Sequence, residues 1–286
     1  MSLPGWIADY HIHTHFSCDS EAEMAAACEA AVARGMREIA FADHADFGPN
    51  DPRRYFRPVE YLKAIEQCRA RYGDRLIIRA GVEMGEPHIF VQESRNILDA
   101  GAFDFVIGSA HYAVSRVNPS TPGDANGLQC AWQESFFEQP LHLAYESYFR
   151  QVVRLAATGD FDVLGHMDLV KRDAHKYGKA YNGPGPYADM IRTALRSIVE
   201  RGKGIEINTS ALYKDKGMSE PCPSLEILRW YRELGGEILT LGSDAHTPDK
   251  IGAHFDVALE MARAAGFKRL ATFEQRQVHW IEIIDK

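Results

Sequence analysis

The sequence lacks the features that mark membrane proteins and disulfide-stabilised secreted proteins. No stretch of about 20 apolar residues occurs, and no basic patch followed by an apolar run opens the chain. Its 286 residues include only 5 cysteines, an odd number without a CxxC pair, which favours free, packed thiols over a disulfide framework. We therefore expect a soluble, cytoplasmic protein.

The chain also lacks an excess of positive charge. Its formal net charge is −8, which argues against a general nucleic-acid or anionic-membrane surface. A phosphate-bearing ligand would have to be held by local positive charge, from metal ions or a few arginines and lysines. With 45% hydrophobic residues, the sequence can form a full core, and its length suits one large α/β barrel.

What the sequence does contain is a sustained alternation of strands and helices. Seven β-rich apolar runs are predicted as strands within residues 6–15, 38–46, 75–86, 103–112, 161–172, 204–212 and 237–246. Helical spacing is found in residues 23–36, 58–73, 145–159, 186–202 and 224–236. Near-continuous apolar strands are typical of a parallel sheet covered on both faces. Because almost every strand ends in a candidate ligand, the pattern favours a closed barrel with its site at the C-terminal rim over a doubly wound sheet.

Two segments interrupt this alternation. Residues 45–58 form a proline-rich loop, and residues 113–140 form a long irregular insertion that we interpret as a lid. No internal repeat or linker divides the chain, so residues 1–286 are expected to form a single domain.

Histidines and carboxylates gather at the predicted strand ends. His11 and His13 share one face of the first strand, because residues i and i+2 of a strand point the same way. The other strand ends carry Asp43, His44, Glu83, His111, His166, Asp244 and His246. Nitrogen and oxygen ligands without thiolates indicate a site for two or three divalent ions of zinc, iron or manganese.

These motifs resemble the PHP superfamily, named for polymerase and histidinol phosphatase. The matching stretches are "HIHTHFSCD" (11–19), "ADH" (42–44), "GVE" (81–83), "GSAH" (108–111), "GHMD" (165–168) and "GSDAH" (242–246). The stretches "DHADFGP", "GHMDLVKR", "EINTSALYK" and "HWIEI" are most similar to the histidinol-phosphate phosphatase branch. The resemblance implies a distorted (β/α)7 TIM-like barrel with a trinuclear metal site.

The resemblance also implies which residues bind each metal. The first metal would be held by His11, His13, Glu83 and Asp244. The second would share Glu83 as a bridge and add His111 and His166. The third would be held by Asp19, His44 and His246, with Asp19 standing where some family members have histidine.

The implied activity is phosphomonoester hydrolysis by attack of a metal-bridging hydroxide, with Glu83 and Asp244 at its centre. The expected substrate is a small phosphorylated metabolite, L-histidinol phosphate, which would be hydrolysed to L-histidinol and phosphate in histidine biosynthesis. Arg172 and Lys214 are candidates for gripping the phosphate, and His15 and His88 are candidates for the general acid.

Three alternatives stay open at this point. A PHP enzyme could act on another small phosphate ester or a nucleotide. An amidohydrolase-type metal hydrolase also opens with HxH on its first strand, and a PHP domain can be a non-catalytic metal-binding module. The sequence does not indicate the oligomeric state.

Overall fold

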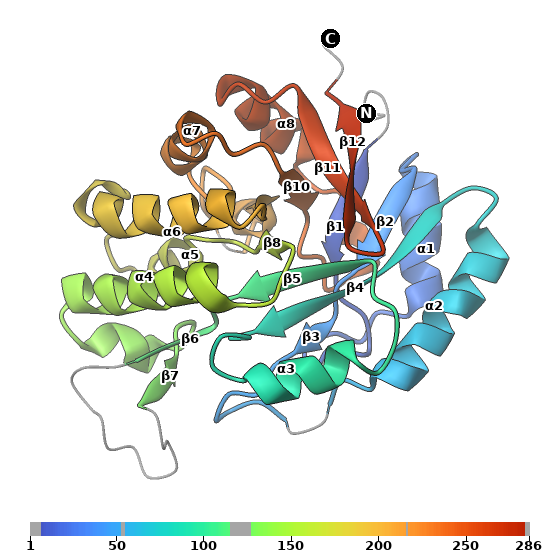
Figure 1. The fold of residues 1–286 in the computed structure, drawn as a ribbon, viewed down its shortest axis with the longest axis horizontal. Helices are drawn as coiled ribbons and strands as arrows, with labels where there is room; N and C mark the ends of the chain where they lie inside the picture. Colours follow the sequence, from blue (N-terminus) through green and yellow to red (C-terminus); the bar gives the residue numbers. More distant parts are fainter. Residues whose placement is uncertain (1–6, 53–54, 115–126, 216, 284–286) are drawn as a thin grey trace.

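Seven parallel strands form a nearly closed barrel in a computed structural model that describes residues 7–52, 55–114, 127–215 and 217–283 (Figure 1). In order around the barrel, the strands are β1 (Ala8–Ile12), β2 (Glu38–Phe41), β4 (Ile77–Gly85), β5 (Phe105–Ser109), β8 (Val163–Leu164), β9 (Gly204–Asn208) and β10 (Leu239–Gly242). A two-residue strand, β3 (His44–Ala45), pairs with the second half of β4. Each of the seven predicted strands is present, which confirms the expected fold class.

The barrel closes where its first and last strands meet. The backbone N–H of His13 donates to the Ala245 carbonyl at 2.9 Å, and the N–H of Ala245 donates to the His11 carbonyl at 3.3 Å. Residues near the two ends of the chain are thereby placed side by side at the C-terminal rim.

Helices cover the outside of the barrel (Figure 1). They are α1 (Met24–Ala33), α2 (Pro58–Tyr72), α3 (Val91–Leu98), α4 (Leu141–Thr158), α5 (Val170–Lys176), α6 (Ala188–Glu200), α7 (Leu225–Glu233) and α8 (Phe255–Ala264). The five predicted helices are confirmed as α1, α2, α4, α6 and α7. Helix α6 shows why they pack: Ile191, Ala194, Leu195 and Ile198 recur at helical spacing and are all buried. The strands they cover are buried along their whole length in β2, β5, β9 and β10.

An antiparallel hairpin of β11 (Arg269–Glu274) and β12 (Gln277–Glu282) closes the N-terminal end of the barrel. The N–H of Phe273 donates to the Tyr10 hydroxyl at 2.7 Å, and that of Arg276 donates to the Asp104 carbonyl, just before β5, at 2.8 Å. With this end sealed, the opposite rim is left for the site.

The structure corrects the prediction for residues 161–172. Strand β8 ends at Leu164, and α5 begins at Val170, so Lys171 and Arg172 lie on a helix and not on a continued strand. Lys171 is buried, and its ammonium pairs with Asp168 at 3.0 Å.

The predicted insertion at residues 113–140 contains ordered structure at both ends. Strands β6 (Tyr112–Val114) and β7 (Leu128–Cys130) form an antiparallel pair, followed by a 3-10 helix, η1 (Glu134–Glu138). Residues 115–126 of the proposed lid lie outside the described residues. Three other 3-10 helices are η2 (Gly185–Tyr187), η3 (Ser210–Leu212) and η4 (Pro248–Lys250).

All five cysteines fall in the described residues and are free, as predicted, and only Cys18 is exposed. Among the described residues, none of the helices has the length and apolar character needed to span a membrane.

Candidate metal centre

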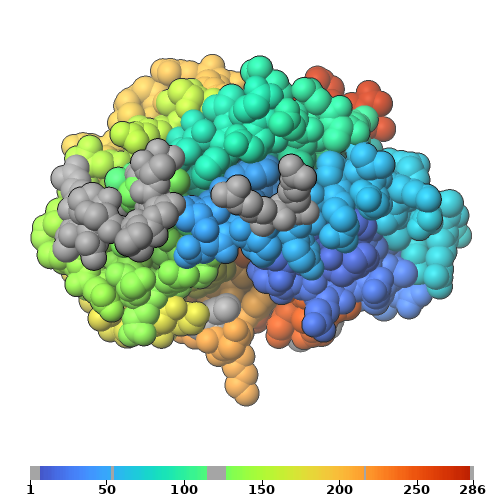
Figure 2. Space-filling model, turned by 90° about the horizontal axis from the view of Figure 1, so that it is seen from below, coloured from blue at the N-terminus to red at the C-terminus, as the bar shows by residue number. Residues whose placement is uncertain are grey.

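A cavity of about 530 Å³ opens at the C-terminal rim of the barrel. Its lining includes six of the predicted ligands, which are Asp19, His44, His111, His166, Asp244 and His246. One side of this rim is formed by the loop after β3, coloured blue in Figure 2, which lies against the green segments around β7. The Asn50 amide donates to Cys130 Sγ at 3.2 Å, and the Tyr112 hydroxyl donates to Asp51 at 3.0 Å.

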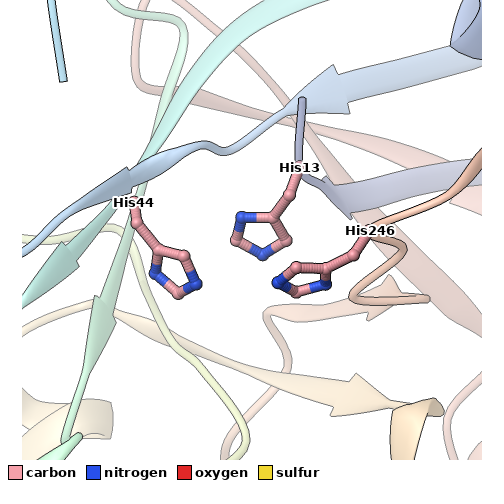
Figure 3. A group of neighbouring side chains, drawn as sticks. All are labelled: His13, His44 and His246. Carbon is pink, nitrogen blue, oxygen red and sulfur yellow. The ribbon is translucent and has the colours of Figure 1, made fainter. Parts of the chain in front are cut away.

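Three imidazoles converge at one part of the rim (Figure 3). His13 follows β1, His44 opens β3, and His246 follows β10. The ring of His13 lies 4.3 Å from that of His44 and 4.2 Å from that of His246, centroid to centroid. One nitrogen from each ring lies within 4.8 Å of the others, so the three side chains could hold a common ion.

Glu83, near the end of β4, lies at the centre of the cluster and is fully buried. Its carboxylate oxygens lie close to a ring nitrogen of each of four histidines, at 2.8 Å from His166, 2.9 Å from His44 and 3.3 Å from both His11 and His111. Burial disfavours the charged carboxylate, but the positive charge of His11, His44 and His111 outweighs it and holds the pKa of Glu83 well below its usual range. One carboxylate shared among so many ligands suits a bridge between two cations.

Asp244 lies between the imidazole of His13 and the guanidinium of Arg172. Its Oδ1 is 3.2 Å from His13 Nε2, and its Oδ2 accepts a hydrogen bond from the Ser210 hydroxyl at 3.0 Å. The backbone φ of Asp244 is +54°, a left-handed conformation that is strained for a residue with a side chain and is concentrated at functional sites. Asp19 lies at the edge of the cluster, with its carboxylate 3.0 Å from His246 Nε2 and 3.6 Å from His44 Nε2.

Unsatisfied polar atoms test whether this cluster fits a metal. Six buried nitrogen and oxygen atoms of the predicted ligands form no hydrogen bond within the described residues, namely His11 Nε2, His13 Nε2, His44 Nδ1, Glu83 Oε2, His111 Nδ1 and His166 Nδ1. Burying polar atoms without hydrogen bonds is costly, and divalent cations would satisfy them. Burial, together with His246 and His44, lowers the pKa of His13 to about 3, so its imidazole is neutral and can donate a lone pair.

Sequence reasoning missed several residues that orient the ligands. Asp46 is almost fully buried and lies 3.3 Å from Nδ1 of both His44 and His111. Ser17 holds His13 through Nδ1 at 3.0 Å and donates to Asp43 at 2.7 Å. The signal for Asp46 was present in the motif "DHAD", because Asp46 is at i+2 from His44 and shares its face in a strand.

The structure places one of the two predicted phosphate-binding residues at the cavity. Arg172 lines the cavity and donates to the Ser210 hydroxyl at 3.0 Å. Lys214 is exposed and is not among the described residues that line the cavity. Lys176 and Lys250, which the sequence analysis did not single out, line the cavity instead.

The two predicted acids are not brought to the cavity. His15 turns toward Glu23, 3.6 Å away, because the chain leaves the strand direction before residue 15. His88 Nε2 is hydrogen-bonded to Gln151 at 3.1 Å, and burial lowers the pKa of its imidazole. Neither histidine belongs to the described lining of the cavity.

Comparison with known proteins agrees with this geometry. The family model of the PHP domain matches residues 9–210, which include the ligands from β1 to β8. The chain belongs to the PHP domain family.

Relatives of this PHP chain place it in the histidinol-phosphatase branch. It is 29% identical to the histidinol-phosphatase of Lactococcus lactis over 281 residues, covering 94% of this chain and 95% of the relative. It is 31% identical over 274 residues to a Clostridium acetobutylicum protein named "Probable histidinol-phosphatase", covering 94% and 98% of the two chains.

A solved structure is similar over nearly the whole PHP chain. The crystal structure of histidinol phosphate phosphatase from Lactococcus lactis, complexed with zinc, L-histidinol and phosphate, has a TM-score of 0.79 and 27% sequence identity. The similarity covers 96% of this chain and 98% of the other.

Proposed function

We propose that this protein is a metal-dependent phosphomonoester hydrolase that converts L-histidinol phosphate and water into L-histidinol and phosphate. The observation that carries the proposal is the cluster centred on Glu83, in which buried nitrogen and oxygen atoms without hydrogen bonds converge at a cavity that Arg172 also lines. The Lactococcus lactis relative, whose crystal structure contains zinc, L-histidinol and phosphate, supports the same substrate.

The ligand groups favour two or three divalent ions, and zinc is the ion present in the Lactococcus lactis structure. His11, His13, Glu83 and Asp244 would hold the first ion, Glu83, His111 and His166 the second, and Asp19, His44 and His246 the third. Bound there, such ions would supply a water molecule of lowered pKa as the nucleophile and neutralise charge on the phosphoryl oxygens.

The side chains of the protein itself have a defined role in binding the ester. Arg172 faces the cavity beside Asp244, and its guanidinium offers paired N–H donors that match phosphate oxygens. Lys176 and Lys250 add positive charge to the same cavity, whose lining also carries six aspartates. Trp132, which also lines the cavity, contacts His111 edge-to-face at 5.7 Å between ring centroids and would pack against the alcohol portion of the ester.

The test is phosphate release from a panel of phosphomonoesters by protein of measured metal content. The panel contains L-histidinol phosphate, a nucleoside monophosphate and a polyol phosphate, and a cyclic amide tests amidohydrolase activity. We expect kcat/KM for L-histidinol phosphate to exceed that for the other esters by at least about 100-fold, as when a site is built to pair specific polar groups. If another ester were preferred, the proposed substrate would be wrong but the proposed phosphomonoester hydrolysis would stand. Turnover of the cyclic amide alone would contradict the proposal.

A further inference from the structure

Glu206 is a buried carboxylate of β9 that contacts two of the proposed ligands. It lies between Ile205 and Ile207 in a strand that is buried throughout, where an unpaired carboxylate would be strongly destabilising. Its Oε1 lies 2.7 Å from Nδ1 of His11 on β1, and its Oε2 accepts a hydrogen bond of 2.9 Å from the backbone N–H of His166 after β8. The Glu206 side chain therefore connects two segments that carry proposed ligands and lie far apart in the sequence.

Gly242 makes room for this carboxylate inside the barrel. A Cβ atom at Gly242 of β10 would overlap Glu206 Oε1 and lie 2.6 Å from His11 Cβ. A Cβ at Gly165, after β8, would overlap Ile107 and the Ser109 hydroxyl but would lie 3.6 Å from Glu206 Oε2, an ordinary contact distance. The space occupied by Glu206 thus depends on the absence of a side chain at Gly242.

The hydrogen-bond pattern around Glu206 suits a carboxylate and not an amide. Two N–H groups, from the His166 backbone and the Asn208 amide, point at Oε2, at 2.9 and 3.2 Å. Since an ionised carboxylate only accepts hydrogen bonds, the ring nitrogen facing Oε1 must be the donor, which places a proton on His11 Nδ1. In the neutral ring, the form that can bind a metal, the unprotonated nitrogen is then Nε2, which faces Glu83 at 3.3 Å and has no hydrogen-bond partner among the described residues.

We propose that Glu206 is a positioning residue that fixes the tautomer and orientation of His11, so that Nε2 is available to the first metal. The inference rests on the proposed metal site and extends it to Glu206, which is not among the described residues that line the cavity. A carboxylate behind a ligating histidine commonly changes metal affinity or activity by about 10–100-fold when it is removed.

The first test compares Glu206→Gln with wild type. The glutamine amide has a single oxygen, so its NH2 group must face either the His166 and Asn208 donors or His11 Nδ1. In the first case the contacts to His166 and Asn208 are lost, and in the second His11 carries its proton on Nε2 and cannot bind the metal there. We expect the Kd for Zn²⁺, measured by competition with a chromophoric chelator, to rise about 10–100-fold.

Glu38→Gln is the matched control, because Glu38 is another buried strand carboxylate. It accepts from the Tyr10 hydroxyl at 2.5 Å and from Arg79 at 2.9 Å, and neither partner is a proposed ligand. We expect the Kd for Zn²⁺ to stay at its wild-type value in this variant. A wild-type Kd in folded Glu206→Gln, or equal weakening in both variants, would overturn the proposal.

A second measurement uses wild-type protein and does not depend on the folding of a variant. Nitrogen-15 NMR of the zinc-loaded protein should show His11 protonated at Nδ1 and bound to zinc through Nε2, with the signals assigned by their loss in His11→Gln. Zinc on Nδ1, or an unprotonated Nδ1, would overturn the inference. Neither measurement uses phosphate release, so an absence of phosphatase activity with the expected zinc result would contradict only the proposed function.

Discussion

Glu83 is the residue on which most of the proposed ligands converge, and its replacement tests the centre directly. Glu83→Gln keeps the shape of the side chain but removes the charge and one acceptor oxygen beside four imidazoles. We expect the variant to lose bound metal and kcat/KM for L-histidinol phosphate to fall by more than about 100-fold. This loss exceeds the roughly 10–100-fold that is typical when a residue hydrogen-bonded to a metal ligand is replaced. Metal analysis and phosphate release measure the two effects. Full metal content with unchanged turnover would refute the bridging role.

Replacement of Arg172 tests the binding of the phosphate separately from the binding of metal. Hydrogen bonds to charged groups contribute about 1.5–3 kcal/mol, so Arg172→Ala should lower kcat/KM by about 10–100-fold. Arg172→Lys should recover only part of the loss, because an ammonium cannot form two parallel hydrogen bonds. Arg150→Ala, which removes an exposed arginine of α4, is the control and should match wild type. If Arg172→Ala also matched wild type, the phosphate would have to bind elsewhere in the cavity.

At the residue scale, the sequence indicated the residues that converge at the rim better than the residues that orient them. His11, His44 and His111 stand at or next to strand ends, so knowing the barrel was enough to bring them together. Glu206 was missed because it lies inside an apolar run, although a lone carboxylate in a buried strand needs a partner. His88 was misplaced because it lies in the turn between β4 and α3, where proximity in sequence to a strand end no longer tells which way a side chain points.

Helix α5 carries Arg172, and a buried ion pair holds this short element in place. Lys171 Nζ contacts Asp168 at 3.0 Å and donates to the Pro221 carbonyl at 2.7 Å, and both charged side chains are fully buried. Lys171→Met leaves the Asp168 carboxylate buried without its cation, which typically costs about 3–5 kcal/mol. We expect the free energy of unfolding, measured by urea denaturation, to fall by this amount.

Arg150→Met is the control for that measurement, because it breaks an exposed pair with Glu146 on α4. Exposed pairs of this kind contribute roughly 0.3–0.5 kcal/mol. Equal losses in the two variants would mean that the Lys171 pair contributes no more than a surface contact.

At the element scale, apolar runs and helical spacing were sufficient to predict the strands and helices that are regular. All seven barrel strands lie in the predicted segments. The prediction of one long strand over residues 161–172 was wrong because β8 has only two residues, and a short apolar run does not distinguish a strand from the start of a helix. The hairpin of β11 and β12 was missed because its pairing is antiparallel and lies outside the strand–helix alternation.

The whole molecule assembles its site only when the barrel closes. Ligands from His11 to His246 are brought together by the contact between the ends of β1 and β10. The unfolded chain holds these side chains far apart, so divalent ions should bind the folded state preferentially and stabilise it.

Metal removal should therefore lower the unfolding temperature of the whole protein. At a free Zn²⁺ concentration about 100 times Kd, one site stabilises the folded state by about 2.7 kcal/mol, and several sites add to this. We expect the unfolding temperature, followed by circular dichroism, to fall after treatment with a chelator and to recover when Zn²⁺ is restored. In Glu83→Gln the difference in unfolding temperature between metal-loaded and metal-free protein should shrink, because Glu83 is a proposed ligand of both the first and the second ion. If wild type unfolded at the same temperature with and without metal, closure of the barrel would not be coupled to ion binding, and the cluster would need another explanation.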